Sequence, residues 1–431
     1  MDIKEFVQQR RDVFIAMRRD FHMYPEPAWL EYRSASKVAD KLISLGYDVA
    51  LGAEVLDLDS RMGLPSEDIM KAAMDRAMDE GADPELVEKM GYGKTAIVAT
   101  MKFSDDGPVV AFRADMDSND VIESKASNHI PAKNGFRSRH EKAMHACGHD
   151  THMTMGLGLA EYIATHKDGL KGTIKLIFQP AEEGVRGAKA MVKAGVVDDV
   201  DLMFGMHIGF NEQLSSCFAC SDHGFLATTK LDAVFHGYSS HAGGSPEKAQ
   251  NAMLAGCTAV INLQAIARHS GGASRMNVGV FESGTGRNVT PDVATLKLET
   301  RGATTEINNY MIERTKTIIK GAAEMHDCTF EITKQGETPA GRISDDLARE
   351  VQSIIEPLGI FKEVPFDYSG GGSEDCAYFL NRVIDRGGRA TYMVLGSAIK
   401  APHHNPLFDI DEEDMLNGIV ALGTIATHYL K

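Results

Sequence analysis

The alternation of predicted strands and helices, which changes character once near residue 226, constrains the fold of this chain most strongly. Hydrophobic periodicity predicts strands at 95–103, 109–113, 173–178 and 202–206, and helices at 153–164 and 188–193. From 226 to 335 the order becomes strand, helix, strand, strand, helix, strand, at 228–235, 247–268, 276–281, 293–299, 307–325 and 329–333. The first pattern is typical of an α/β domain on a central sheet, and the second of the ferredoxin-like β-α-β-β-α-β unit.

This order predicts two domains, one inserted into the other. A chain of 431 residues is too long for one simple core. A complete unit of about a hundred residues inside a longer α/β chain is typical of an inserted domain. We therefore expect a catalytic domain formed by 1–225 and 336–431, and a second domain formed by 226–335.

Residues 64–92 predict a further insertion, a charged helical hairpin within the first domain. Ser66 stands where a helix cap is expected, and Met70, Met74 and Met78 recur every four residues. A methionine stripe of this kind either packs in the core or covers a substrate entrance. The sequence leaves both interpretations open.

The charge and cysteine content limit the class of partner and the compartment. Lys and Arg number 45 against 61 Asp and Glu, a formal net charge of -16, so neither nucleic acid nor an anionic membrane is an expected partner. The six cysteines are scattered, and Cys217 and Cys220 alternate with apolar residues as a strand would, which favours reduced structural thiols. The N-terminus lacks an apolar signal core, and no segment is apolar enough to span a membrane. We expect a cytoplasmic protein.

One short segment concentrates metal-binding chemistry. His145-Ala146-Cys147-Gly148-His149-Asp150-Thr151-His152 holds one thiol and three imidazoles beside a carboxylate. Thiolate and imidazole together bind borderline-soft divalent metals, and Gly148 allows the turn that directs Cys147 and His149 to one ion. Packing alone is a poor explanation for such density, although a histidine by itself is often a core or solvated residue.

Further candidate ligands follow predicted strands. They are Asp115 and Asp117 after 109–113, Glu182 and Glu183 after 173–178, and His207 after 202–206, with His403 and His404 near the C-terminus. In α/β folds the carboxyl ends of strands converge on one crevice. The glutamate pair alone is also typical of an ordinary first turn of a helix.

Five ligands would exceed the three that a single open catalytic zinc keeps. The set Cys147, His149, Glu183, His207 and His404 therefore predicts two ions that share a ligand, and the Cys147 thiolate could bridge them. Neighbouring residues cannot point the same way. One glutamate of the pair as ligand thus leaves the other free to act as general base on a water molecule.

Seven motifs carry a family resemblance: Arg113-Ala114-Asp115-Met116-Asp117, His145-Ala146-Cys147-Gly148-His149-Asp150, Gln179-Pro180-Ala181-Glu182-Glu183, Gly205-Met206-His207, Ser240-His241-Ala242, Gly372-Ser373-Glu374-Asp375 and His404-Asn405-Pro406. In this order they resemble the aminoacylase and carboxypeptidase-like co-catalytic metallopeptidases, and within them the branch of hippurate, auxin-conjugate and aminobenzoyl-glutamate hydrolases. The resemblance implies Cys147 as bridging thiolate, with His149, Glu183, His207 and His404 as the other ligands and Glu182 as general base. His404 ranks before His403 because Pro406 and Phe408 complete a His-x-Pro-x-Phe pattern.

The resemblance also implies a zinc-peptidase-like catalytic domain whose inserted domain is a lid that mediates dimerisation. His241 would reach the active site of the neighbouring chain and stabilise the tetrahedral oxyanion. Asn288 and Arg301 match positions that contact the substrate's carboxylate, and a guanidinium suits that role. Gly371 and Gly372 match a flexible substrate loop. The alternative for Arg301 is an exposed charge at a strand end.

The activity implied is metal-dependent hydrolysis of the amide bond of an N-acyl or N-aroyl amino acid. The 64–92 hairpin resembles an insertion in the aminobenzoyl-glutamate hydrolases, which favours p-aminobenzoyl-glutamate as substrate. The alternatives are hippurate or N-acetyl-amino-acid hydrolysis, a dipeptidase activity and a non-catalytic metal-binding subunit. The resemblance indicates two divalent ions per chain, manganese first, with zinc, cobalt or nickel able to substitute. The expected assembly is a homodimer or a heterodimer with a homologous second subunit.

Overall fold

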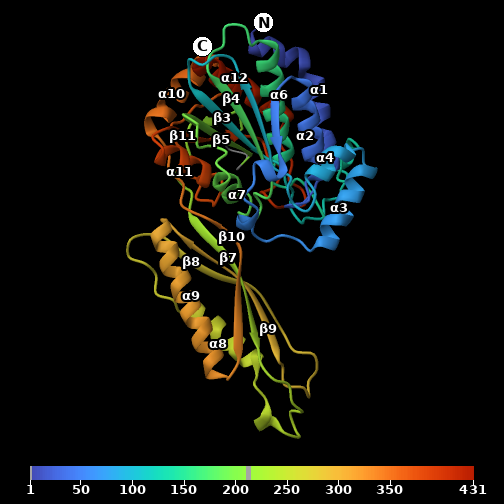
Figure 1. Ribbon diagram of the computed structural model, residues 1–431, viewed down its shortest axis with the longest axis vertical. Helices are drawn as coiled ribbons and strands as arrows, with labels where there is room; N and C mark the ends of the chain where they lie inside the picture. Colours follow the sequence, from blue (N-terminus) through green and yellow to red (C-terminus); the bar gives the residue numbers. More distant parts are fainter. Residues whose placement is uncertain (1, 210–214) are drawn as a thin grey trace.

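The computed structural model describes residues 2–209 and 215–431, which form a large lobe and a small lobe, each built on its own β-sheet (Figure 1). The two chain termini lie at the end of the large lobe that is remote from the small lobe (Figure 1). The sheet of the large lobe has the strand order β1-β2-β4-β3-β5-β11-β6. Its strands are β1 (Asp48–Leu51), β2 (Ile97–Lys102), β3 (Val109–Asp115), β4 (Thr173–Gln179), β5 (Leu202–Gly209), β6 (Phe218–Ala219) and β11 (Arg389–Gly396).

The four central strands, β4, β3, β5 and β11, run parallel, and helices cover both faces of the sheet. Along β3, Val110 and Phe112 pack toward one set of helices and Ala111 toward the other, because side chains alternate across a strand. The first set is α1 (Ile3–Met23), α2 (Tyr32–Ser44), α6 (His149–Thr165), α10 (Asp345–Ile355) and α12 (Glu412–Leu430), and the second is α7 (Ala188–Lys193) and α11 (Ala377–Asp385). The carboxyl ends of the parallel strands therefore meet at one edge of the sheet.

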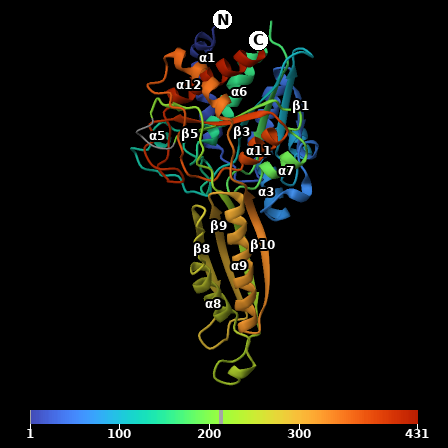
Figure 2. The same cartoon turned by 90° about the vertical axis from the view of Figure 1, so that its left-hand side faces the viewer.

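The small lobe is an antiparallel sheet in the order β10-β7-β9-β8, with two helices packed on one face (Figure 2). Its elements are β7 (Ala227–His236), α8 (Ala252–Gln264), β8 (Ser274–Ser283), β9 (Val293–Gly302), α9 (Thr305–Met325) and β10 (Thr329–Thr338). This is the predicted β-α-β-β-α-β order, so the α/β fold class with a ferredoxin-like unit is confirmed. The exact domain limits stay a prediction, and β10 runs past residue 335.

Two local predictions differ from the structure. Helix α8 is shorter than the predicted 247–268, because the Asn251 side chain caps it by accepting a hydrogen bond from the Leu254 backbone N–H. His207 lies inside β5 rather than after it, since that strand extends to Gly209.

The predicted hairpin consists of α3 (Glu67–Asp79) and α4 (Pro84–Lys89). Ser66 precedes α3 but makes no side-chain cap hydrogen bond there, so its predicted capping role is wrong. Met70 is buried, and Met74 and Met78 pack against the main core. The methionine stripe is therefore core.

The remaining short helices are α5 (Ile130–Lys133) and 3-10 turns at Gly52–Glu54, Leu58–Ser60, Pro246–Lys248 and Glu356–Leu358. Within 2–209 and 215–431, none of the helices combines the length and the apolar character that crossing a membrane requires. All six cysteines are free thiols, and Cys217 and Cys220 are buried beside β6.

Candidate active site

The segment from Cys147 to His149 turns sharply at the start of α6. Gly148 is the N-cap residue of that helix and has φ +90°, which L side chains rarely adopt. A Cβ at this position would lie 2.8 Å from Ile208 Cγ2. The close approach of α6 to β5 therefore requires glycine, and this approach brings Cys147 toward His207.

The five predicted metal ligands converge at the carboxyl edge of the central sheet. Cys147, His149 and His207 offer ligand atoms within 4.8 Å of one another, and so do Cys147, Glu183 and His404. Cys147 Sγ lies 3.4 Å from His207 Nε2, and His404 Nε2 lies 3.3 Å from Glu183 Oε1. Cys147 thus belongs to both groups, which is the position of a residue that bridges two ions.

The imidazoles of this cluster are oriented by backbone carbonyls. His149 Nδ1 donates to the Asp117 carbonyl at 2.8 Å, and His207 Nδ1 donates to the Ile208 carbonyl at 2.7 Å. In each ring this leaves Nε2 to face the cluster, as in histidines that bind metals through one nitrogen. His149 Nε2 is buried and has no hydrogen-bond partner among the described residues. A buried polar atom in this state fits a divalent ion.

The side chain of Asp117 fixes the glutamate pair. Its Oδ1 accepts from the Glu182 backbone N–H at 3.0 Å and its Oδ2 from the Glu183 N–H at 2.9 Å. The two glutamates then diverge: Glu183 faces His404, while Glu182 Oε2 lies 3.9 Å from His149 Nε2.

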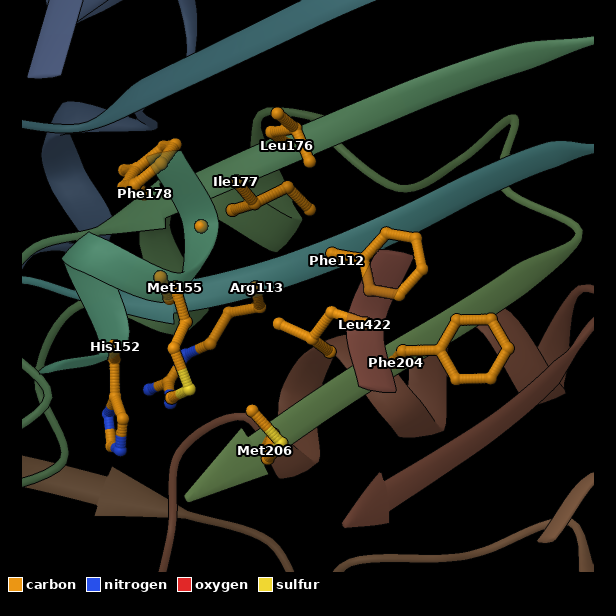
Figure 3. Close-up of a pocket in the computed structure, with 12 residues that line it drawn as sticks. Phe112, Arg113, His152, Met155, Leu176, Ile177, Phe178, Phe204, Met206 and Leu422 are labelled. Carbon is orange, nitrogen blue, oxygen red and sulfur yellow. The ribbon is translucent and has the colours of Figure 1, made fainter. Parts of the chain in front are cut away.

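The predicted neighbour Asp115 supports the cluster from behind. It accepts from His152 Nδ1 at 2.5 Å and from Arg113 Nη1 at 2.5 Å, while His152 Nε2 accepts from the Ile208 N–H. Both nitrogens of His152 are therefore satisfied within the protein. Figure 3 shows His152 and Arg113 beside an apolar cavity of about 20 Å³ in the core. His152 is a packing and hydrogen-bonding residue here, not a candidate ligand.

The ionisation of the glutamate pair is split by its surroundings. Burial and the nearby Glu374 and Glu183 carboxylates raise the pKa of Glu182 well above its usual range. Burial opposes ionisation of Glu183 as well, but the hydrogen bond from His404 and the charge of His149 lower its pKa to about 2. One carboxylate is thus suited to hold a cation and its neighbour to carry a proton.

His404 and His403 occupy different positions. His404 has φ +63° and its backbone N–H donates to the Ala146 carbonyl at 2.8 Å, which places its ring against Glu183. His403 Nε2 lies 3.3 Å from the Ile208 carbonyl, and burial lowers the pKa of its imidazole to about 4. Both line the cavity, but His404 and not His403 joins the Cys147 and Glu183 group.

A cavity of about 210 Å³ opens between the cluster and the small lobe. Arg301, a predicted substrate contact, lines it from β9, and Lys230 lines it from β7. Glu299 lies between the two cations, accepting from Arg301 Nε at 2.9 Å and lying 3.6 Å from Lys230 Nζ. Lys230 was not predicted, because one lysine in an alternating strand gives no signal of its own. Gly372 also lines the cavity, whereas Gly371 does not.

His241 and Asn288 are not brought to this cavity in the same chain. They lie together beyond the far ends of β7 and β9, where the Ala242 N–H donates to the Asn288 carbonyl at 3.1 Å. Arg301 and Val293 mark opposite ends of β9, about 26 Å apart at 3.3 Å per strand residue. The two predicted residues are therefore remote from the cluster within one chain.

Comparisons with known proteins agree with this geometry. The model of the family described as Peptidase family M20/M25/M40 matches residues 111–428. The chain is 44% identical over 428 residues to the indole-3-acetyl-aspartic acid hydrolase of Enterobacter agglomerans and, also over 428 residues, to one subunit of the p-aminobenzoyl-glutamate hydrolase of Escherichia coli K12, with 99% of this chain and 98% of each relative covered. The crystal structure of an aminobenzoyl-glutamate utilization protein from Klebsiella pneumoniae superposes with a TM-score of 0.86 at 39% identity, covering 100% of this chain and 99% of that one.

The fold and the site together define a metal-dependent enzyme that hydrolyses amide bonds. The chain belongs to peptidase family M20/M25/M40.

Proposed function

We propose that this enzyme cleaves the amide bond of N-aroyl amino acids, with p-aminobenzoyl-glutamate as substrate and p-aminobenzoate and glutamate as products. The observation that carries the proposal is that Cys147 joins two groups of metal ligands directly beside Glu182. The full-length similarity to one subunit of a p-aminobenzoyl-glutamate hydrolase supports the choice of substrate. Indole-3-acetyl-aspartate is a second candidate, because a relative of equal identity is named for it.

The donor set fits two divalent ions. His149 and His207 would hold one, Glu183 and His404 the other, and Cys147 both. When bound, the ions supply Lewis acidity toward the amide carbonyl and lower the pKa of a water molecule. We expect manganese, with zinc, cobalt or nickel able to substitute.

Glu182 carries the proton in this proposal. It accepts a proton from the attacking water as the C–O bond forms, and it delivers that proton to the amide nitrogen as the C–N bond breaks. Its backbone is fixed by Asp117, so the carboxylate is positioned before the substrate arrives. Burial of the site excludes bulk water and strengthens these interactions.

The cations of the small lobe would bind the amino-acid half of the substrate. Arg301 uses Nε and Nη2 on Glu299, which leaves Nη1, now 3.4 Å from Ser373 Oγ, directed toward the cavity side. Lys230 adds a second positive charge on the adjacent strand. Together they would provide the local positive field that the acidic chain otherwise lacks.

A second chain would complete the site. His241 and Asn288 are remote from the cavity of their own chain, so a neighbouring chain is the route by which they could reach a substrate. The small lobe offers a contact surface, because β8 is an edge strand and Leu254 and Ile261 of α8 are 49% and 71% exposed. The partner is a second copy or a homologous subunit, since the Escherichia coli relative is named as one subunit of its hydrolase. A cytoplasmic location belongs to the same proposal.

The proposal is tested by hydrolysis assays on metal-stripped protein reloaded with manganese. The panel is p-aminobenzoyl-glutamate, indole-3-acetyl-aspartate, hippurate, acetyl-glutamate and a dipeptide with a free amino terminus. We expect selective release of p-aminobenzoate, with kcat reduced about 1000-fold or more in Glu182→Gln. Preference for the dipeptide would overturn the proposed substrate class, and no turnover with any ion would favour a non-catalytic subunit.

A further inference from the structure

The wall of the cavity contains a carboxylate that the proposed reaction does not use. Asp222 is 1% exposed and lines the cavity just before the chain enters β7. Its Oδ1 accepts from the Gly224 N–H at 2.7 Å and from the Gly370 N–H at 3.0 Å. Within the part of the chain that the structure describes, Oδ2 has no hydrogen bond.

The other carboxylates of the cavity are already engaged. Glu182 and Glu183 belong to the candidate metal centre. Glu374 accepts from Arg113 Nη2 at 2.9 Å and from the Cys376 N–H at 3.0 Å on Oε1, and from the Tyr392 hydroxyl at 2.7 Å on Oε2. Asp222 is therefore the acidic residue of the cavity wall with an oxygen left to accept from a ligand.

Aromatic side chains stand next to this carboxylate. Phe225, three residues after Asp222, lines the same cavity and packs edge-on against Tyr392, with ring centroids 4.9 Å apart and an interplanar angle of 84°. Val185 adds a third apolar contact to the lining. The cavity thus combines an aromatic wall with one buried acceptor, whereas its cations, Lys230 and Arg301, come from the sheet of the small lobe.

We propose that Asp222 determines acyl-group specificity by accepting a hydrogen bond from an N–H on the aromatic ring system of the substrate, while Phe225 and Tyr392 contact the ring. This inference rests on the proposed function and names its acyl subsite. The ligand class is an aromatic acyl group that carries an N–H donor. A p-aminobenzoyl group has such a donor in its amine and an indole-3-acetyl group has one in its ring, whereas a benzoyl group has none. A buried acceptor without a donor is costly, so acyl groups of the last kind would be disfavoured.

The variant Asp222→Asn tests the subsite. Its Oδ1 can still accept from Gly224 and Gly370, but Nδ2 then replaces Oδ2 and presents a donor to the cavity. We would measure kcat/KM of wild type and variant on p-aminobenzoyl-, benzoyl- and p-nitrobenzoyl-glutamate. Electronic effects of the para substituent act equally on both proteins and cancel when their ratios are compared.

We expect the preference for p-aminobenzoyl- over benzoyl-glutamate to fall about 10- to 100-fold in the variant. The p-nitro substrate, which has acceptor oxygens, should gain relative to benzoyl-glutamate. Asp232→Asn, on β7 but outside this cavity, is the matched control and should leave both ratios unchanged. An equal loss on all three substrates would show that Asp222 only holds the Gly370 loop, and would overturn the inference.

A measurement on wild type alone covers the case in which the variant does not fold. Competitive inhibition by p-aminobenzoate should be stronger than inhibition by benzoate or p-nitrobenzoate, and equal inhibition constants would overturn the inference. These failures differ from failure of the proposed function, in which wild type would hydrolyse none of the aroyl-glutamates.

Discussion

Asp117 holds the Glu182 backbone N–H on Oδ1 at 3.0 Å, and with its other oxygen it holds the next residue in the same way at 2.9 Å. Its backbone carbonyl accepts from His149 Nδ1. One residue therefore fixes a candidate ligand on α6 and the glutamate pair that follows β4. These segments are far apart in the sequence, and their relative position decides whether two ions can be held.

Replacing Asp117 by Asn should weaken metal binding. The amide cannot accept on both sides, so one of the two backbone N–H groups loses its partner and the glutamate pair shifts. We expect manganese affinity to fall about 10- to 100-fold, measured by competition with a chromophoric chelator. Asp120→Asn, an exposed neighbour, is the control. Unchanged affinity in Asp117→Asn would contradict the role given to this carboxylate.

Replacing Glu182 by Gln should stabilise the metal-free protein in a pH-dependent manner. Burial and like charges raise the pKa of this carboxyl in the folded state, whereas the unfolded chain ionises near the ordinary value. The folded state consequently loses stability as the pH rises above that ordinary value. We expect the thermal midpoint of Glu182→Gln to exceed that of wild type at pH 7.5, with the difference vanishing near pH 4. A difference independent of pH would argue against a buried, protonated Glu182.

The buried His22 should give the opposite dependence. Burial and Arg18 disfavour its charge, but hydrogen bonds to Asp150 and Glu123 outweigh them and raise the pKa to about 9. Its stabilising contribution is therefore complete below pH 6.5 and is lost as the pH rises through 9, an effect of up to about 3 kcal/mol. His22→Gln should flatten the fall in thermal midpoint between pH 6.5 and 9.5, whereas the exposed His428→Gln should not. Parallel pH curves for wild type and His22→Gln would refute this assignment.

The parts of the molecule that sequence predicts well are those that depend on local pattern. Apolar periodicity located the strands of the small lobe and the helices at both termini to within a few residues. Gly148 between Cys147 and His149 signalled the turn, because few other residues adopt its φ. The five ligands could be gathered because each follows or ends a parallel strand.

Other features depend on packing between distant segments and leave no local mark. Lys230 reaches the cavity only because β7 pairs with β9, and Asp222 lines it because the loop at Gly370 folds back on the chain before β7. Ser66 has the right residue type for a cap but makes no such hydrogen bond. The short strand β1 was missed because four residues of mixed exposure show no clear alternation.

Replacing Gly148 by Ala should damage both stability and metal binding. The φ of +90° is unfavourable for alanine by about 1–2 kcal/mol, and the added Cβ would lie 2.8 Å from Ile208 Cγ2. We expect a fall of about 2 kcal/mol or more in the free energy of unfolding, together with weaker manganese binding. Gly135→Ala, also at positive φ but with open space around it, separates the backbone cost from the clash. Equal losses in the two variants would show that contact with Ile208 is unimportant.

Mixing two inactive variants should restore activity if His241 acts on a neighbouring copy. In a dimer of one Glu182→Gln chain and one His241→Ala chain, one site lacks both residues and the other retains both. The second site should turn over at the wild-type rate, so about a quarter of wild-type activity is expected from a statistical mixture of dimers. The assay is hydrolysis after the variants are mixed under conditions that exchange chains between dimers. Variants mixed without exchange are the control, and no recovery after proven exchange would mean that His241 serves its own chain or none.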